Sequence, residues 1–208
     1  MKRRAITTNN YHNNHPIMAD SMMGYAADKN ILSKIEEQFD YAEESKSKTY
    51  FMRYDVRFPK NFTHTDNGLF SAFQSAFMKN LSRQGLKPQY LAVREQSREK
   101  HQHYHVCLWL DGQKTQNISN HIKTAERLWD ATLNLPPRED GYRLIDSCTK
   151  SRKGKAQING VMLNRLAEDY AARRDECFYR ASYLAKVNSK KTPQGQREIF
   201  ASRIPNKK

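Results

Sequence analysis

The spacing of apolar residues divides the chain into strands and helices. Apolar residues alternate through residues 49–58, which predicts a strand that Pro59 ends. They recur at helical spacing through residues 67–84, which predicts a helix that stops at Gly85. The same patterns predict strands at residues 89–95, 102–110 and 141–146, and helices at residues 28–45, 118–133 and 159–186.

From residue 49 the predicted order is strand, helix, strand, strand, helix, strand and a further helix. This order is typical of an α+β, ferredoxin-like fold, with one antiparallel sheet and two helices on one face. The other face would be free for a ligand or an added helix. We expect an N-terminal arm and short helix over residues 1–47, a main domain over 48–188 and a basic, flexible tail over 189–208.

Composition narrows the class of partner. The 208 residues carry 36 Lys and Arg against 22 Asp and Glu, a net charge of +14, which favours a polyanion such as nucleic acid over a merely solvated surface. No apolar run is long enough to span a bilayer and no signal peptide is recognisable. Three widely spaced cysteines without a CxxC pair argue against disulfides and zinc–thiolate sites, so we expect a cytoplasmic protein.

Histidines alternate through the predicted strand at residues 102–110. His103 and His105 therefore lie on one face, with the apolar Tyr104 between them pointing to the other. Two imidazoles in this arrangement are suited to share a divalent cation, although single strand histidines are usually ordinary half-exposed residues. His101 would share the same face if the strand began earlier.

A metal held by two histidines needs at least one further ligand. Glu95 at the end of the preceding predicted strand is one candidate, and Glu99 in the connection is the other. Alternation alone does not decide between them, because the pairing register of the strands is unknown. Two imidazoles with oxygen ligands suit Mn²⁺, and Mg²⁺ is abundant, so either ion is expected.

A second group of reactive side chains lies near the end of the last predicted helix. Tyr179 and Tyr183 are one helical turn apart, and Lys186 follows on the same side, roughly opposite the apolar stripe. Taken alone, such tyrosines are typical of an amphipathic surface. Beside a metal site, however, a tyrosine can attack a phosphodiester, with the cation polarising phosphorus and an ammonium offsetting the developing charge.

The motifs in this order resemble those of the HUH endonucleases. Two histidines flank a hydrophobic residue at His103–His105, and a tyrosine follows on a later helix in Tyr183–Lys186. More closely, residues 48–188 resemble the inovirus-type replication proteins that include the prophage proteins YagK and YfjJ, with residues 50–57 as the first motif. Residues 1–47 and the tail have no counterpart in this resemblance.

The resemblance implies a role for each motif residue. His103, His105 and Glu95 would bind the metal, Tyr183 would be the nucleophile with Lys186 assisting, and Tyr179 would be a second tyrosine. The implied activity is site-specific nicking and joining of single-stranded DNA at a phage or prophage origin through a 5′-phosphotyrosine, as in rolling-circle replication. No helicase P-loop is present, so a host helicase would have to unwind the duplex.

Basic and aromatic residues supply candidate DNA contacts. Phe51 and Trp109, on the expected open face, could stack on bases. The candidate phosphate contacts are Arg53, Arg57, Arg94, Lys150, Arg152, Lys153 and Lys155. Two other functions fit the same pattern: a non-catalytic nucleic-acid-binding regulator, and a nuclease that uses water instead of tyrosine.

Overall fold

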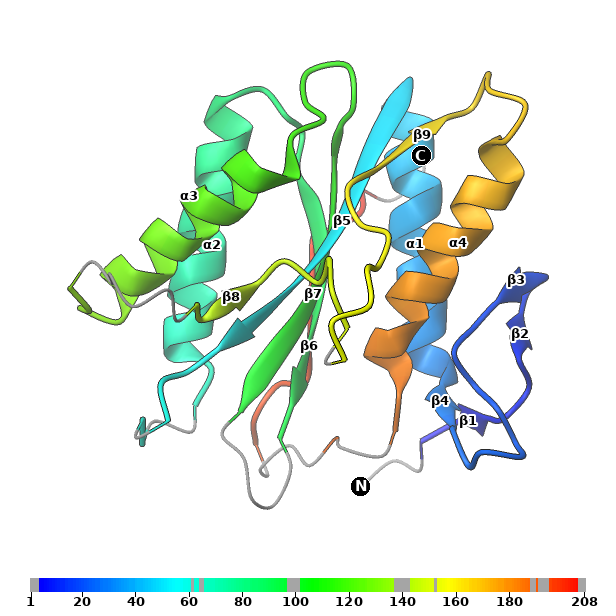
Figure 1. Cartoon of the computed structure of the whole chain (residues 1–208), viewed down its shortest axis with the longest axis horizontal. Coiled ribbons are helices and arrows are strands. Elements are labelled where there is room, and N and C mark those ends of the chain that lie inside the picture. Colours follow the sequence, from blue (N-terminus) through cyan, green and yellow to red (C-terminus); the bar gives the residue numbers. More distant parts are fainter. Residues whose placement is uncertain are drawn as a thin grey trace.

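A mostly antiparallel sheet with helices on both faces organises the protein (Figure 1). The computed structural model describes residues 4–60, 62–63, 66–96, 102–136, 143–151, 153–187, 190 and 195–205. The α+β class predicted from the sequence is confirmed.

The sheet has the strand order β10-β6-β7-β5-β8, and β9 also pairs with β5. Its strands are β5 (Lys48–Arg57), β6 (Gln89–Glu95), β7 (His103–Asp111), β8 (Ile145–Asp146), β9 (Val161–Asn164) and β10 (Ile199–Ala201). Strand β7 lies between β5 and β6 and is antiparallel to both. The four strands predicted from alternation are therefore confirmed, with β8 shorter than expected.

Each face of the sheet is covered by a pair of helices. Helices α2 (Gly68–Arg83) and α3 (Ile118–Thr132) lie on one face, and α1 (Lys29–Ser45) and α4 (Tyr170–Ser182) lie on the other (Figure 1). The alternation of β7 serves both layers, because Tyr104 packs in the core under α2 whereas Trp109 packs under α1. The second face, which we expected to be free for a ligand or an added helix, is therefore covered by α4 and also by α1.

Helix α1 covers the part of the second face that carries Phe51 and Trp109. Asp28 caps it by accepting hydrogen bonds from the backbone N–H groups of Asn30 and Ile31. Phe39, on its buried stripe, packs edge-on against Trp109 with 5.1 Å between ring centroids. Trp109 is 0% exposed and Phe51 is 1% exposed, so the prediction that these two rings stack on DNA bases is wrong.

Segments near both ends of the described chain belong to the folded structure. The N-terminal arm contains the short strands β1 (Ile6–Thr7), β2 (Tyr11–His12), β3 (His15–Pro16) and β4 (Ala27–Asp28). Near the C-terminus, β10 pairs with β6, and its central residue Phe200 packs on Phe70 and Tyr104. The prediction of a flexible tail over residues 189–208 is therefore wrong at Ile199–Ala201. These apolar residues form a strand at the edge of the sheet.

The helix predicted over residues 159–186 begins later than expected. Val161 and Leu163 are buried in strand β9, and a turn joins Asn164 to Ala167 before α4. Leu166, an apolar residue within the predicted helix, is 94% exposed. The start of the predicted helix is therefore wrong. Val161 and Leu163 fit a helical as well as a strand pattern over so short a segment, and pairing with β5 decides that they form a strand.

We expect Trp109→Ala to lower the free energy of unfolding by about 3–5 kcal/mol, because it would leave a cavity between the sheet and α1. Urea denaturation followed by circular dichroism measures the change. Leu166→Ala is the control, since this exposed side chain should contribute less than about 0.5 kcal/mol. Equal stability of Trp109→Ala and the wild type would contradict the packing described here.

Candidate functional site

A cavity of about 970 Å³ lies where the sheet meets the end of α4. Strands β5, β6 and β7 form its floor, the segment after β8 forms one wall, and the end of α4 forms another. The residues predicted from the sequence that line it are Arg53, Arg57, Glu95, His103, His105, Lys150, Tyr183 and Lys186. Side chains from separate parts of the chain thus converge on one site.

Strand register brings the ionisable side chains of the floor together. Glu95 of β6 is the direct partner of His103 of β7, and Asp55 of β5 is the direct partner of His105. Directly paired residues share a face of the sheet, so both carboxylates point to the same side as both imidazoles. This register brings Glu95 to the histidines.

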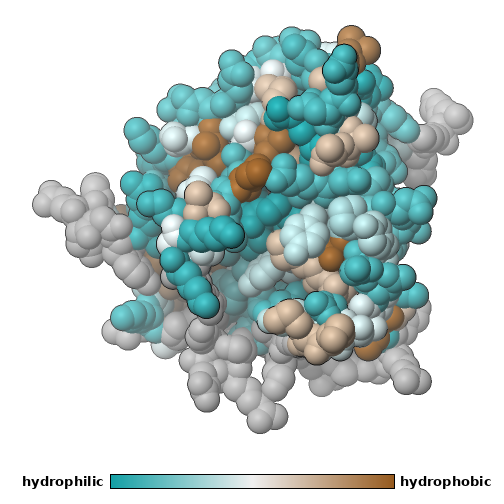
Figure 2. Space-filling model, turned by 45° about the vertical axis from the view of Figure 1, so that its right-hand side comes forward, coloured by the Kyte–Doolittle hydropathy of each residue, from teal (hydrophilic) through white to brown (hydrophobic). Residues whose placement is uncertain are grey.

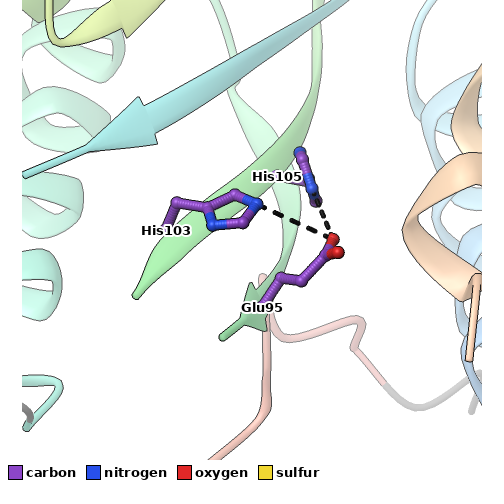
Figure 3. Close-up of side chains that lie close together, drawn as sticks. All are labelled: Glu95, His103 and His105. Atoms are coloured by element: carbon purple, nitrogen blue, oxygen red, sulfur yellow. Dashed lines mark hydrogen bonds and ion pairs between the residues drawn. The ribbon is translucent and has the colours of Figure 1, made fainter. Parts of the chain in front are cut away.

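Glu95, His103 and His105 form a group that could hold a metal ion (Figure 3). One ligand atom from each residue lies within 4.8 Å of the others. Oε2 of Glu95 is 2.7 Å from Nε2 of His105 and 3.8 Å from Nε2 of His103. Burial opposes the negative charge of Glu95, but the hydrogen bond and the positive field of the histidines prevail and lower its pKa to about 2. Glu95 is therefore anionic at neutral pH, as a metal ligand would need to be.

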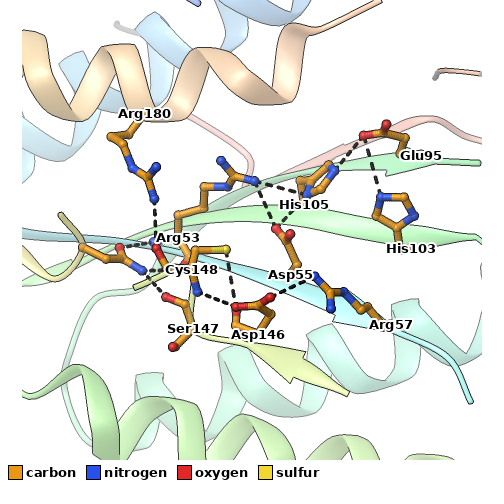
Figure 4. Close-up of polar contacts among 11 residues, drawn as sticks. Arg53, Asp55, Arg57, Glu95, His103, His105, Asp146, Ser147, Cys148 and Arg180 are labelled. Atoms are coloured by element: carbon orange, nitrogen blue, oxygen red, sulfur yellow. Dashed lines mark hydrogen bonds and ion pairs between the residues drawn. The ribbon is translucent and has the colours of Figure 1, made fainter. Parts of the chain in front are cut away.

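Asp55 fixes the orientation of His105 from the opposite side (Figure 4). Oδ1 of Asp55 is 2.6 Å from Nδ1 of His105, and Arg53 Nη2 lies 3.3 Å from the same oxygen. Burial disfavours the carboxylate, but His105 and Arg53 outweigh it and hold the pKa of Asp55 well below its ordinary value. When Nδ1 donates its proton to Asp55, the lone pair of Nε2 is left for a metal ion.

Tyr183 lies directly above this floor. Its ring centroid is 5.0 Å from that of His105, and the guanidinium carbon of Arg53 is 4.2 Å from the centre of the tyrosine ring. Tyr183 begins the 3-10 turn η1 (Tyr183–Ala185) that ends α4, and Leu184 and Ala185 in this turn are fully buried. The tightened turn therefore anchors the chain on the core while the tyrosine ring faces the histidines.

The N-terminal arm holds the turn that carries Tyr183. The backbone N–H of Met18 donates to Oγ of Ser182 at 2.8 Å, and the N–H of Val187 donates to the carbonyl of Ala26 at 3.0 Å. The ammonium of Lys190 donates to the carbonyl of Leu184. These bonds fix both ends of the turn, so the arm and the tyrosine form one unit.

The other two residues of the predicted tyrosine group differ in position. Lys186 lines the cavity, with its ammonium 5.7 Å from the centre of the Tyr183 ring. Tyr179 is 43% exposed and is not among the lining residues. It lies one turn, about 5.4 Å, farther back along the helix axis, beyond the edge of the cavity.

The predicted DNA contacts are only partly brought to the cavity. Arg94 is 0% exposed and bonds Asn67 on the other face of the sheet, so its prediction as a DNA contact is wrong, as is that of Trp109. Lys153 and Lys155 are exposed but do not line the cavity. Glu99, His101 and Arg152 lie outside the described residues.

Sequence patterns missed two residues of this site. Asp55 alternates with the apolar residues of its strand, but only the register with β7 brings it to His105. Arg180 extends from α4 toward the segment after β8, where its Nη2 donates to the carbonyl of Cys148 at 3.0 Å (Figure 4). Its position three residues before Tyr183 was the available signal.

In the view of Figure 2, hydrophilic residues predominate on the surface, and hydrophobic residues form small, separate patches. Within the described ranges, none of the helices has the length and apolar character needed to cross a membrane.

Comparison with protein-family models identifies a family. The model of the family described as the YagK/YfjJ C-terminal domain matches residues 7–201. The match includes the N-terminal arm, α1 and β10, which the resemblance seen in the sequence did not cover. No curated protein and no solved structure matches the chain.

We expect Asp55→Asn to weaken Mn²⁺ binding by about 10–100-fold, because His105 would lose the carboxylate that orients it. Calorimetric titration with Mn²⁺ measures the change. Asp175→Asn is the matched control, since Asp175 also pairs with a histidine, His15, at 2.6 Å but does not line the cavity. Wild-type Mn²⁺ affinity in a folded Asp55→Asn variant would contradict this role.

Proposed function

The chain belongs to the YagK/YfjJ C-terminal domain family, and from this premise we propose that it is a metal-dependent HUH endonuclease. It would nick and rejoin single-stranded DNA through a 5′-phosphotyrosine, as the initiator of rolling-circle replication of a phage or prophage element. The observation that carries the proposal is the position of Tyr183 over a Glu–His–His group, with 5.0 Å between the rings of Tyr183 and His105.

The topology supports a ferredoxin-like HUH fold. Strands β8, β5, β7 and β6 are adjacent in that order, while β5, β6, β7 and β8 follow one another along the chain. Helix α2 joins β5 to β6, and α3 joins β7 to β8. This is the split βαβ arrangement, to which the protein adds β9 and β10.

The residues fit the proposed cation. One carboxylate oxygen and two imidazole nitrogens, with a second carboxylate orienting one imidazole, form a donor set suited to Mn²⁺ or Mg²⁺. When bound, such an ion would polarise the phosphate for attack. The remaining ligand positions would be left for phosphate oxygens and water.

The proposed reaction exchanges one phosphoester bond for another. The phenol oxygen of Tyr183 attacks phosphorus and loses its proton, the Tyr183–phosphorus bond forms, and the bond from phosphorus to the 3′ oxygen breaks. The 3′ oxygen takes up a proton and leaves as a hydroxyl, while the phosphate stays on the 5′ side of the nick. Rejoining is the reverse attack by a 3′ hydroxyl, so no external energy source is required.

Positive charge around the site supports a DNA substrate. Arg53 and Lys186 flank the Tyr183 ring, and Arg57 and Lys150 line the same cavity. The substrate in this proposal is single-stranded DNA at an origin in the cytoplasm, and a separate helicase would supply it by unwinding the duplex.

We expect Tyr183→Phe to abolish covalent attachment to single-stranded DNA while binding stays within about twofold, because only the nucleophilic oxygen is removed. The assay uses a labelled strand carrying the element's origin, Mn²⁺ and a denaturing gel. Tyr179→Phe is the matched control on the same helix, and it should retain the first attachment.

The same gel separates the competing functions. A nuclease that uses water would still cut as Tyr183→Phe, and a binding regulator would cut in no form. Absence of an adduct from the wild type on every origin-derived strand would remove the initiator function. An adduct lost in Tyr179→Phe and kept in Tyr183→Phe would show that the other tyrosine attacks.

Affinity for single-stranded DNA should fall by more than about tenfold between 50 mM and 200 mM salt, since several phosphate contacts would release counterions. Fluorescence anisotropy with a labelled oligonucleotide measures this. Lys150→Gln should reduce the salt dependence, whereas Lys79→Gln on α2 should leave it unchanged. An affinity independent of salt would contradict an electrostatic interface.

A further inference from the structure

Two arginines form a cationic side of the cavity next to the tyrosine. Arg53 belongs to β5 and Arg180 to α4, and both side chains line the cavity. The guanidinium group of Arg53 lies over the Tyr183 ring at 4.2 Å. Arg180, three residues before Tyr183, is on the same helix end. The pair therefore lies on the tyrosine side of the site, and Arg53 also contacts the Glu–His–His group, with its Nη2 3.4 Å from Nδ1 of His105 (Figure 4).

Both arginines have hydrogen-bonding capacity that the protein does not use. The Nε atoms of Arg53 and Arg180 are buried, and neither has a hydrogen-bond partner within the described part of the chain. Arg53 as a whole is only 6% exposed. A buried N–H group without an acceptor destabilises the fold, so such a group needs an explanation. A bound ligand with acceptor oxygens would provide the missing hydrogen bond.

The charge of this side is only partly neutralised. Arg53 is paired with Asp55, whereas Arg180 has no ion pair among the described residues and donates to a neutral carbonyl. Burial and then the positive charge of Arg53 lower the pKa of Arg180 below its ordinary value. Burial also opposes the charge of Arg53, but Asp55 outweighs it and raises the pKa of Arg53. Both groups remain cationic at neutral pH, so the two charges repel each other.

We propose that Arg53 and Arg180 form a phosphate-binding subsite that grips the phosphate attacked by Tyr183. Guanidinium groups present several N–H donors in a planar fork, which suits the oxygens of a tetrahedral phosphate. A phosphate between them would supply the missing acceptors and offset the repulsion between the cations. The inference rests on the proposed function for the identity of the phosphate, which would become the phosphotyrosine.

Binding of inorganic phosphate tests the subsite without requiring cleavage. The full chain, free of divalent ions, is titrated with phosphate, and the Nε–H signals of its arginines are followed by NMR. The wild type should show saturable shifts of the Arg53 and Arg180 signals. Arg180→Gln should weaken phosphate binding by about tenfold, and Arg180→Lys by less, because it keeps the charge.

Arg173→Gln is the matched control. Arg173 is on the same helix, pairs with Asp169 at 2.5 Å on the surface and does not line this cavity. Its loss should leave phosphate affinity unchanged. Arg53→Lys provides a second variant that keeps a cation beside Asp55, and it should also weaken binding. Thermal unfolding verifies that each variant is folded.

The outcomes separate the subsite from the proposed function. No saturable shift of either signal in the wild type, or equal phosphate affinity in folded Arg180→Gln, would overturn the subsite even if the wild type forms a DNA adduct. Saturable shifts in a protein that forms no adduct would support the subsite and remove the proposed tyrosine endonuclease function. If the subsite and the proposed function are both correct, Arg180→Gln should slow adduct formation by about tenfold and leave Mn²⁺ affinity unchanged.

Discussion

The pairing of β7 with β5 and β6 is the constraint on which the rest of the site depends. It brings Glu95 opposite His103 and Asp55 opposite His105, so a metal-ligand group and its orienting carboxylate follow from backbone hydrogen bonds. A shift of one residue in either pairing would turn a carboxylate to the opposite face. The hydrophobic clusters on the two faces of the sheet, one containing Tyr104 and the other Trp109, oppose such a shift. It would move apolar side chains out of one cluster and bury charged side chains in their place.

The second face of the sheet is divided between packing and chemistry. At one end of β7, Cys107 and Trp109 are covered by α1 and α4, and at the other end His103 and His105 line the cavity. Helix α4 serves both ends, since its apolar side packs in the core and its last turn presents Tyr183 to the histidines. The N-terminal arm bonds that turn, which makes the arm part of the same structural unit as the site.

Buried charge is tolerated here because it is shared. Asp55 interacts with both His105 and Arg53, and Glu95 interacts with both histidines. An unpaired charge at this depth would be strongly destabilising, whereas a connected network recovers most of the cost of desolvation. The charges of the cavity are unevenly distributed. The carboxylates of Glu95 and Asp55 lie at the histidines, and the cationic side chains of Arg53 and Lys186 lie at Tyr183.

The sequence by itself determined the main strands, three helices and the grouping of His103 and His105, because side-chain period is a local property. It also singled out Tyr183 and Lys186, although not that Tyr179 lies outside the cavity. Only the tertiary structure decided that Asp55 and Arg180 join the site, that Trp109 and Arg94 are buried, and that residues 161–164 and 199–201 are strands. Each of these depends on which strand pairs with which and in what register, and long-range pairing leaves no period in the sequence of either partner.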